Sequence, residues 1–143
     1  MTAKWRTAAL AVAIFLVSAS AAAAAVYQKN QTLPYGELNW DRGYVKVSAV
    51  GLPPFGAVGV ETARANAVSA AQKRLLSVLL DLDVKGGKVR DRLAGHDELK
   101  TKLRGLVFAA SVKGKNYADG SVEVTLTMPL NGPNGLQAFL DTL

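Results

Sequence analysis

The sequence predicts an α+β fold of two layers, in which an antiparallel sheet of about four strands packs against one long and one short helix. Three observations predict it. Alternation of apolar and polar residues marks strands near both ends of the region 36–132, and each of these strands has a neighbour across a turn. Between the two hairpins, the apolar residues recur every three or four positions, as they do in helices. Hairpins that are segregated from helices along the chain favour an antiparallel sheet covered by helices.

The first hairpin is predicted at residues 36–50. The turn composition Asp-Arg-Gly at 41–43 separates a strand at 36–40 from a strand at 44–50. Apolar and polar residues alternate in the second strand, so we expect one buried face. The loop at 51–56 contains two successive prolines, which end the strand. We interpret this loop as the connection from sheet to helix, with a ligand-facing loop as the alternative.

The long helix is predicted over residues 61–82. Its apolar positions follow one stripe: Ala63, Ala67, Val68, Ala71, Leu75, Val78, Leu79 and Leu82. The alanines at its start are small enough to let the helix lie close on a sheet. Leu76 and Leu80 lie off that stripe, roughly 80° to 120° around the helix from Val68. They either widen the buried face or mark a contact with a second helix or another protein.

The segment that follows contains the short helix. Two glycines end the long helical unit, and residues 88–90 are expected to form a short extended piece. The short helix is predicted over 97–104, where Leu99 and Leu103 form an apolar pair four residues apart. Acidic residues in its first turn and basic residues in its last turn suit the helix dipole. Gly105 is predicted to end this helix.

The second hairpin is the clearest unit of the sequence. A β-rich segment at 106–117 leads through Ala-Asp-Gly at 118–120 to a strand at 121–128 that alternates strictly. A cluster of proline, asparagine and glycine ends this strand, and the residues after it can form a short helix. The order of elements is therefore ββ-α-α-ββ.

The N-terminus has the three-part pattern of a secretory signal peptide. A positive segment with Lys4 and Arg6 precedes a strongly apolar centre at 10–17, and the small residues that follow suit cleavage after Ala23 or Ala25. The alternative is an uncleaved N-terminal anchor, since the uncharged run approaches the roughly 20 residues that a bilayer needs. Its strongly apolar part is short, so we expect a soluble protein exported to the periplasm. The predicted parts are a signal peptide at 1–25, an extended leader at 26–35, the α+β domain at 36–132 and a C-terminal tail at 133–143.

The composition restricts the chemistry. The chain has no cysteine, which excludes disulfides, cysteine-ligated zinc, iron–sulfur clusters, thiol catalysis and a lipid attached through cysteine. Its single histidine, His96, precedes a predicted helix and has no evident partners for a catalytic triad. The glycine-bearing segment 51–59 lacks the spacing of a phosphate-binding loop. We therefore expect no enzymatic activity, no catalytic or metal-binding residues and no cofactor.

The charge is unevenly distributed. The net charge of +6 falls to +4 without the two cations of the predicted signal peptide. Between residues 83 and 115 there are nine Lys or Arg and four acidic residues. All nine cations lie within residues 85–115, which we call the basic segment 85–115. Within it, Lys113 and Lys115 share one face of a strand. Such a surface keeps a protein soluble, or it attracts anionic lipid head groups, lipopolysaccharide phosphates or acidic proteins. Export argues against a nucleic-acid partner.

Four segments occur in a recognisable order. The first segment is Leu-Asn-Trp-Asp-Arg-Gly at 38–43, which leads to Val-Gly-Leu-Pro-Pro, and the second is an Ala/Arg-rich helix at 63–76. The third is Leu-Arg-Gly-Leu-Val-Phe-Ala-Ala at 103–110, and the fourth is Tyr-Ala-Asp-Gly-Ser-Val-Glu-Val at 117–124. This series resembles the bacterial Lpp-twenty lipoprotein family, which is related to the N-terminal domain of the flagellar assembly protein T. The resemblance covers about residues 36–132 and implies an antiparallel sheet flanked by helices in an envelope protein without known catalytic residues.

Two departures from the family pattern limit what the resemblance implies. The lipobox cysteine is missing, so a lipid tether is not expected. Phe108 and Ala109 stand where the family often has a basic residue and a glycine, so an anion-related role of that position is not expected either.

These observations predict an exported, non-catalytic binding or assembly module. Its partner is expected to be another periplasmic, flagellar or outer-membrane protein, or a second copy of the chain. The predicted contact residues are hairpin aromatics, leucines outside the main helical stripe and lysines of one strand face: Trp40, Tyr44, Leu76, Leu80, Lys113 and Lys115. The alternative is a protein that binds an anionic envelope polymer or lipid through the basic segment 85–115, in which case binding weakens steeply as salt rises.

Overall fold

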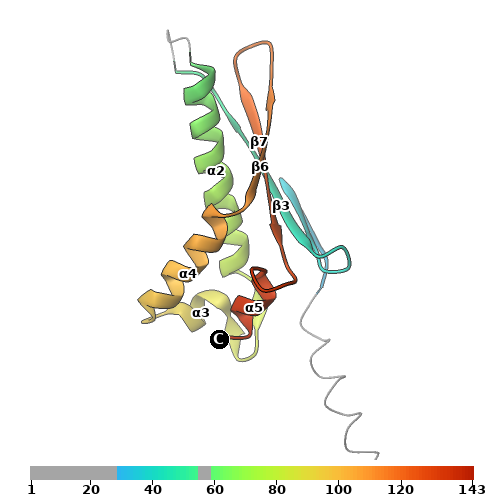
Figure 1. Cartoon of the computed structure of the whole chain (residues 1–143), viewed down its shortest axis with the longest axis vertical. Coiled ribbons are helices and arrows are strands. Elements are labelled where there is room, and N and C mark those ends of the chain that lie inside the picture. Colours follow the sequence, from blue (N-terminus) through green and yellow to red (C-terminus); the bar gives the residue numbers. More distant parts are fainter. Residues whose placement is uncertain (1–28, 55–58) are drawn as a thin grey trace, which may run out of the picture.

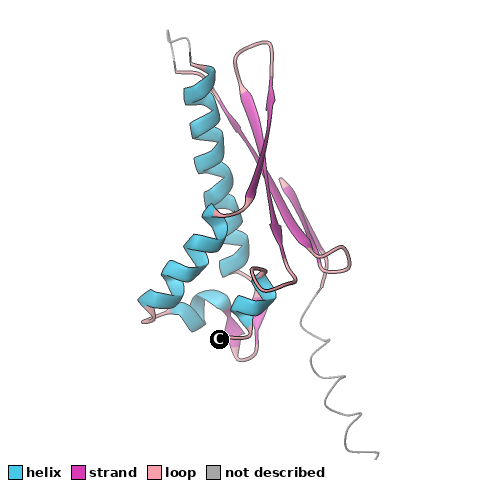
Figure 2. Cartoon of the chain, in the orientation of Figure 1, coloured by secondary structure: helices cyan, strands magenta, loops and turns pink. Residues whose placement is uncertain are grey.

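A computed structural model describes residues 29–54 and 59–143 (Figure 1). The predicted signal peptide, its cleavage site and the anchor alternative lie outside the described residues, as does the end of the loop predicted at 51–56. The described chain has helices on one side and an antiparallel sheet on the other (Figure 2), which confirms the predicted α+β class.

The main sheet has five antiparallel strands in the order β1-β2-β3-β7-β6. These are β1 (Gln31–Leu33), β2 (Gly36–Asn39), β3 (Tyr44–Gly51), β6 (Ser111–Asn116) and β7 (Val122–Pro129). The two predicted hairpins are β2–β3 and β6–β7, and they join at the centre of the sheet, where β3 pairs with β7 from Tyr44↔Pro129 to Gly51↔Val122. The fifth strand, β1, comes from the segment 26–35 that was predicted as an extended leader. It pairs with β2 at Gln31↔Leu38.

The long helix, α2 (Val60–Leu80), lies along the sheet and packs on β3 and β7 (Figure 1). Its alanines Ala63, Ala67 and Ala71 are fully buried, as are the inward side chains of both central strands: Val45, Val47, Val122, Val124, Leu126 and Met128. The approach is close, because a Cβ on Gly51 would lie 1.9 Å from the carbonyl oxygen of Ala63. The small residues of the stripe therefore allow the helix and strand backbones to touch. Val68 is half-buried at the edge of this contact.

The connection after α2 differs from the prediction. The strands β4 (Asp83–Val84) and β5 (Gly87–Lys88) form a small second sheet, and α3 (Val89–Leu93) follows at once. The short extended piece predicted at 88–90 is therefore wrong beyond Lys88. Asp91 caps the helix by accepting a hydrogen bond from the Lys88 backbone N–H at 3.1 Å. Val89 and Leu93 are buried one turn apart, which holds α3 on the core.

The helix α4 (Asp97–Phe108) continues through Gly105, so the predictions that this glycine ends the helix and that a strand begins at 106 are wrong. A glycine in a helix interior costs about 1 kcal/mol relative to alanine. Beyond it, however, Val107 and Ala110 continue the buried face that Leu103 begins. Burial of a valine side chain alone contributes about 1.5 kcal/mol or more, which outweighs the cost of the glycine. In the predicted tail, α5 (Leu136–Leu140) forms the short helix, with Leu136 and Phe139 buried.

The other face of the main sheet carries polar side chains. Along β3 and β7, half-buried residues such as Lys46, Ser48 and Thr125 alternate with the buried ones. The Ser48 and Thr125 hydroxyl oxygens are 2.8 Å apart and share a hydrogen bond. Within residues 29–54 and 59–143, α2, α3 and α4 lie on the opposite side of the sheet (Figure 1). The described domain thus has one covered and one open sheet face.

Candidate interaction surfaces

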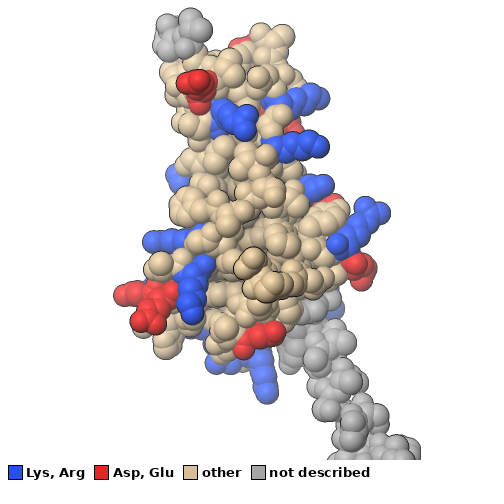
Figure 3. Space-filling model, viewed as in Figure 1, with Lys and Arg blue, Asp and Glu red and all other residues tan. Residues whose placement is uncertain are grey.

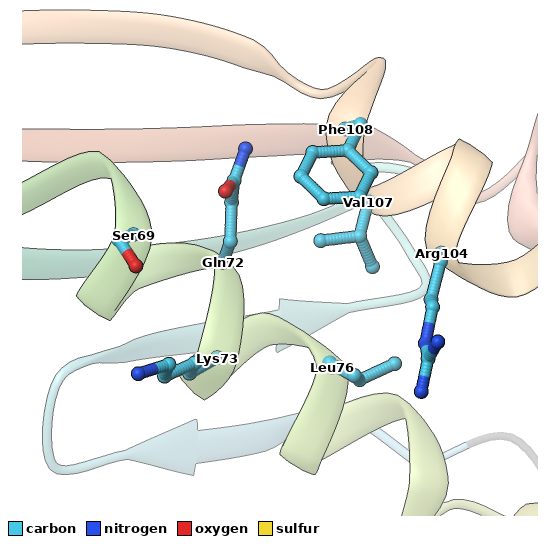
Figure 4. A pocket seen from close by; sticks show the side chains of 7 residues that line it. All are labelled: Ser69, Gln72, Lys73, Leu76, Arg104, Val107 and Phe108. Atoms are coloured by element: carbon cyan, nitrogen blue, oxygen red, sulfur yellow. The ribbon is translucent and has the colours of Figure 1, made fainter. Parts of the chain in front are cut away.

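Two adjoining hollows between α2, α3 and α4 form one groove, which we call the helical groove. The first has a volume of about 190 Å³ and lies between α2 and α4, where Gln72 extends from α2 towards Val107 and Phe108 and Ser69 lines the hollow one turn earlier (Figure 4). The second has a volume of about 260 Å³ and extends to α3. Leu76 and Arg104 line both hollows, so the groove is continuous along the second half of α2.

The floor of the helical groove is apolar. Leu76 and Leu80 of α2 are half-buried, and Leu93 and Leu103 beside them are buried. The two α2 leucines lie outside the alanine-rich stripe because they face α3 and α4 rather than the sheet. The structure therefore brings the predicted contact residues Leu76 and Leu80 into one site. Both leucines widen the buried face of α2, as one interpretation predicted. They also border an open groove, which leaves them available for the contact that the other interpretation predicted.

Phe108 borders one end of the groove. Its side chain is 68% exposed, and Figure 4 shows it beside Val107 at the end of α4, across from Leu76. A large exposed apolar side chain next to an apolar floor is typical of a contact surface. Phe108 is not among the contact residues predicted from the sequence, because the β-rich segment 106–117 predicts a strand at this position. The four-residue step from Leu103 to Val107, continued through the glycine between them, is the signal that could have found it.

Four cationic side chains surround the apolar floor: Lys73, Arg90, Lys100 and Arg104. None of the described residues that line the groove is acidic. Arg90 pairs with Asp81, and the Lys100 ammonium lies 3.8 Å from the Asp97 carboxylate. Arg104 forms no ion pair within the part of the chain that the structure describes. Exposed pairs of this kind contribute only about 0.2 to 1 kcal/mol, so the rim remains available to an anionic partner.

The predicted lysines of the second hairpin form a separate surface. Lys113 and Lys115 lie opposite Thr125 and Glu123 of β7, on the open face of the sheet. The Lys115 ammonium is 5.3 Å from the centre of the Tyr117 ring, and the Tyr117 hydroxyl donates a hydrogen bond of 2.8 Å to the Glu123 carboxylate. This hydrogen bond, with burial and the carboxylate charge, raises the pKa of Tyr117. Through these contacts, Tyr117 and Glu123 hold the Lys115 side chain in place on this face.

The basic segment 85–115 consequently does not make one patch. Lys100 and Arg104 border the helical groove, whereas Lys113 and Lys115 project from the other side of the sheet. Figure 3 shows Lys and Arg side chains spread over several elements of the face in view, including the side that carries the β6–β7 hairpin. Only a tertiary structure separates these two groups of cations, because they are close in the sequence.

The aromatic residues of the first hairpin lie at a third place. Trp40 is half-buried against the core, and its backbone N–H donates to the Asn30 side chain at 2.6 Å. The Tyr44 hydroxyl donates a hydrogen bond to Glu37, and this bond, together with burial, raises the pKa of Tyr44. The Lys46 ammonium lies 4.9 Å from the Tyr44 ring centre. The partners of Trp40 and Tyr44 are thus within the chain itself, and neither residue borders the helical groove.

His96 is exposed at the start of α4, and its side chain makes no capping hydrogen bond there. In the described ranges, no three or more His, Asp or Glu side chains gather in a way that could hold a metal ion. Within the same ranges, no helix has the length and apolar character needed to span a membrane.

Comparison of the chain with family models, with curated proteins and with solved structures yields no match. The resemblance to the Lpp-twenty family therefore stays a prediction from four short segments.

Proposed function

We propose that the chain is a non-catalytic binding or assembly module of the cell envelope, and that the helical groove docks an amphipathic helix of another protein. The observation that supports this most directly is the open apolar floor with Leu76 and Leu80 between cationic side chains. Grooves of this type receive a helix through apolar anchors at steps of three, four and seven residues. The cationic rim favours acidic residues on the flanks of that helix.

The groove has the length that a docked helix requires. Its α2 side runs from Ser69 to Leu80, which is about 16 Å at the helical rise of 1.5 Å per residue. A partner helix of about three turns covers that distance and places three anchors on the floor. Phe108 at one end and Leu93 at the other then contact its first and last anchors.

The envelope location is part of the same proposal. The signal-peptide pattern at the N-terminus and the resemblance to the Lpp-twenty family support it. A periplasmic, flagellar or outer-membrane protein is accordingly the proposed source of the partner helix, and no catalytic residue is assigned.

Titration with two fluorescent helical peptides tests the docking. Both carry leucines at i, i+4 and i+7; one has glutamates on its flanks and the other has lysines. We expect the acidic peptide to bind about tenfold or more tightly than the basic one at low salt, because of the cationic rim. Arg104→Glu should weaken binding of the acidic peptide, whereas Lys88→Glu, an exposed change on β5 outside the groove, should leave it unaltered. Equal binding of the two peptides, or equal effects of the two variants, contradicts the proposal.

The cationic rim also supports a second candidate function, the binding of an anionic envelope polymer or lipid. Co-sedimentation with phosphatidylglycerol vesicles, compared with phosphatidylcholine vesicles, measures this binding and its fall with salt. Vesicle binding that Arg104→Glu abolishes, in a protein that binds neither peptide, favours the second candidate over the first.

A further inference from the structure

The strand β6 forms one edge of the main sheet, and all six of its residues are exposed. The register of the hydrogen bonds shows which of its backbone groups are free. The Tyr117 N–H donates to the Ser121 carbonyl at 2.9 Å. Because hydrogen-bonded and non-hydrogen-bonded pairs alternate in an antiparallel ladder, Lys113 and Lys115 also bond to β7. The N–H and C=O groups of Val112, Gly114 and Asn116 then point to the free edge.

The other side of β7 confirms this alternation. The Leu130 N–H donates to the Gly43 carbonyl at 2.9 Å, so the even-numbered residues of β7 bond to β3. Its odd-numbered residues, Glu123 and Thr125 among them, are left for β6, where they lie opposite Lys115 and Lys113. Two independent hydrogen bonds thus give the same assignment of the free backbone groups of β6.

The side chains along this edge differ between the two faces. On the open face, Lys113 and Lys115 project without an ion pair in the described part of the chain. On the helix side, Val112 is 43% exposed, and Gly114 lies under the Arg64 guanidinium, whose Nη1 would be 3.1 Å from a Cβ at that position. A strand added here would meet Lys113 and Lys115 on the open face, and the Val112 side chain and the Arg64 guanidinium on the helix side.

In the register centred on Gly114, a second copy of the chain does not suit this edge. Antiparallel pairing of two β6 strands about Gly114 places Lys113 of each copy opposite Lys115 of the other, and like charges directly opposite each other are destabilising. Lysines on an edge strand commonly act against such self-pairing. The residues of this chain outside the described ranges, 1–28 and 55–58, contain no Asp or Glu that could neutralise the lysines. An acidic strand of another protein therefore complements this edge better than these segments do.

We propose that β6 binds an extended segment of another protein as a sixth strand, and that this segment carries acidic residues at alternate positions. Backbone hydrogen bonds from Val112, Gly114 and Asn116 supply the affinity, as in other cases of strand addition. Lys113 and Lys115 select acidic side chains on the open face, and small or apolar residues lie beside Val112 on the helix side. This site is separate from the helical groove, so it can exist whether or not a helix docks there.

The test uses the full chain and two labelled eight-residue peptides, one with glutamate and one with lysine at alternate positions, each with valine or threonine between. We expect the glutamate peptide to bind and the lysine peptide to bind about tenfold or more weakly. Gly114→Pro removes one free-edge N–H and places its ring in the path of the added strand, which edge strands tolerate in the folded protein. It should weaken binding about tenfold, whereas Gly114→Ala, which meets the same Arg64 side chain but keeps the N–H, should bind within about twofold of the parent.

Amide hydrogen exchange supplies a readout that needs no variant. The amides of Val112, Gly114 and Asn116 should exchange rapidly in the free protein and become protected when the glutamate peptide is added, while those of Lys113 and Lys115 are protected from the start. Arg104→Glu in the helical groove should leave this binding unchanged, which separates a failure here from a failure of the groove. Equal binding of the two peptides, equal affinities of the proline and alanine variants, or unchanged exchange at the three free-edge amides overturns the proposal.

Discussion

Replacing Gly51 by alanine tests the contact between α2 and the sheet. A Cβ at this position would lie 1.9 Å from the carbonyl oxygen of Ala63 and 2.7 Å from the backbone nitrogen of Ala67. Both atoms belong to the backbone of α2, so no side-chain rotation relieves the overlap and the helix must move away from β3. Overpacking in a core costs about 1 to 3 kcal/mol. We expect Gly51→Ala to lower the free energy of unfolding by an amount near the upper end, about 3 kcal/mol.

The same substitution at Gly105 is the matched control, with the opposite sign. A Cβ there meets nothing within 4 Å, and the residue lies inside α4. Alanine is favoured over glycine in a helix interior, so Gly105→Ala should raise the free energy of unfolding by about 0.5 to 1 kcal/mol. Urea denaturation followed by circular dichroism measures both changes. A Gly51→Ala variant as stable as the parent refutes the close packing of α2 on β3, and a destabilising Gly105→Ala refutes the continuation of α4.

Three further predictions concern titration and capping. The hydrogen bond to Glu123 holds the pKa of Tyr117 above its usual 10.0, so the unfolded chain loses the Tyr117 proton at a lower pH than the folded chain does. The free energy of unfolding should therefore fall as the pH rises beyond about 10, and it should fall less steeply in Tyr117→Phe. Equal slopes in the two proteins would count against that hydrogen bond. The Ser121 hydroxyl and N–H donate hydrogen bonds to the Asp119 carboxylate and hold its pKa below 3.8. The carboxylate therefore adds to the free energy of unfolding above about pH 4, and this stabilisation is lost as the pH falls through the lower pKa of the folded state. This pH dependence should disappear in Asp119→Ala. Asp91→Ala removes the cap of α3 and should cost about 1 kcal/mol in urea denaturation, while Asp91→Asn, which keeps an acceptor, should recover much of it; no loss in the alanine variant would refute the cap.

The elements predicted correctly from the sequence are those with one buried face, because burial of one face imposes a regular spacing on the apolar residues. The strands at 44–50 and 121–128 alternate strictly because each has one side on the core. The three-residue strand β1 is too short to show any period, and its place in the sheet depends on pairing with β2. In α3 a single apolar pair, Val89 and Leu93, flanks three charged residues, which left no helical period to detect. At Gly105 the local preference to end a helix was outweighed by packing of the next turn.

The candidate sites divide in the same way. Leu76 and Leu80 were predicted because their angular position on one helix can be read from spacing alone. Phe108 and the cations of the rim come from α3 and α4, so their approach to those leucines depends on tertiary packing. Likewise, alternation placed Lys113 and Lys115 on one face, but only the strand order shows that β6 is an edge.

Site-specific photocrosslinking at Phe108 tests docking in the helical groove most directly. A photoreactive phenylalanine analogue at this exposed position keeps the aromatic ring beside the groove, and the same analogue at Val50, which is 53% exposed, serves as a control away from it. In intact cells we predict a discrete protein adduct from position 108 that Arg104→Glu abolishes and Lys88→Glu preserves. The absence of an adduct, an equal adduct from position 50, or an adduct that Arg104→Glu leaves unchanged would contradict a protein-binding role for this groove.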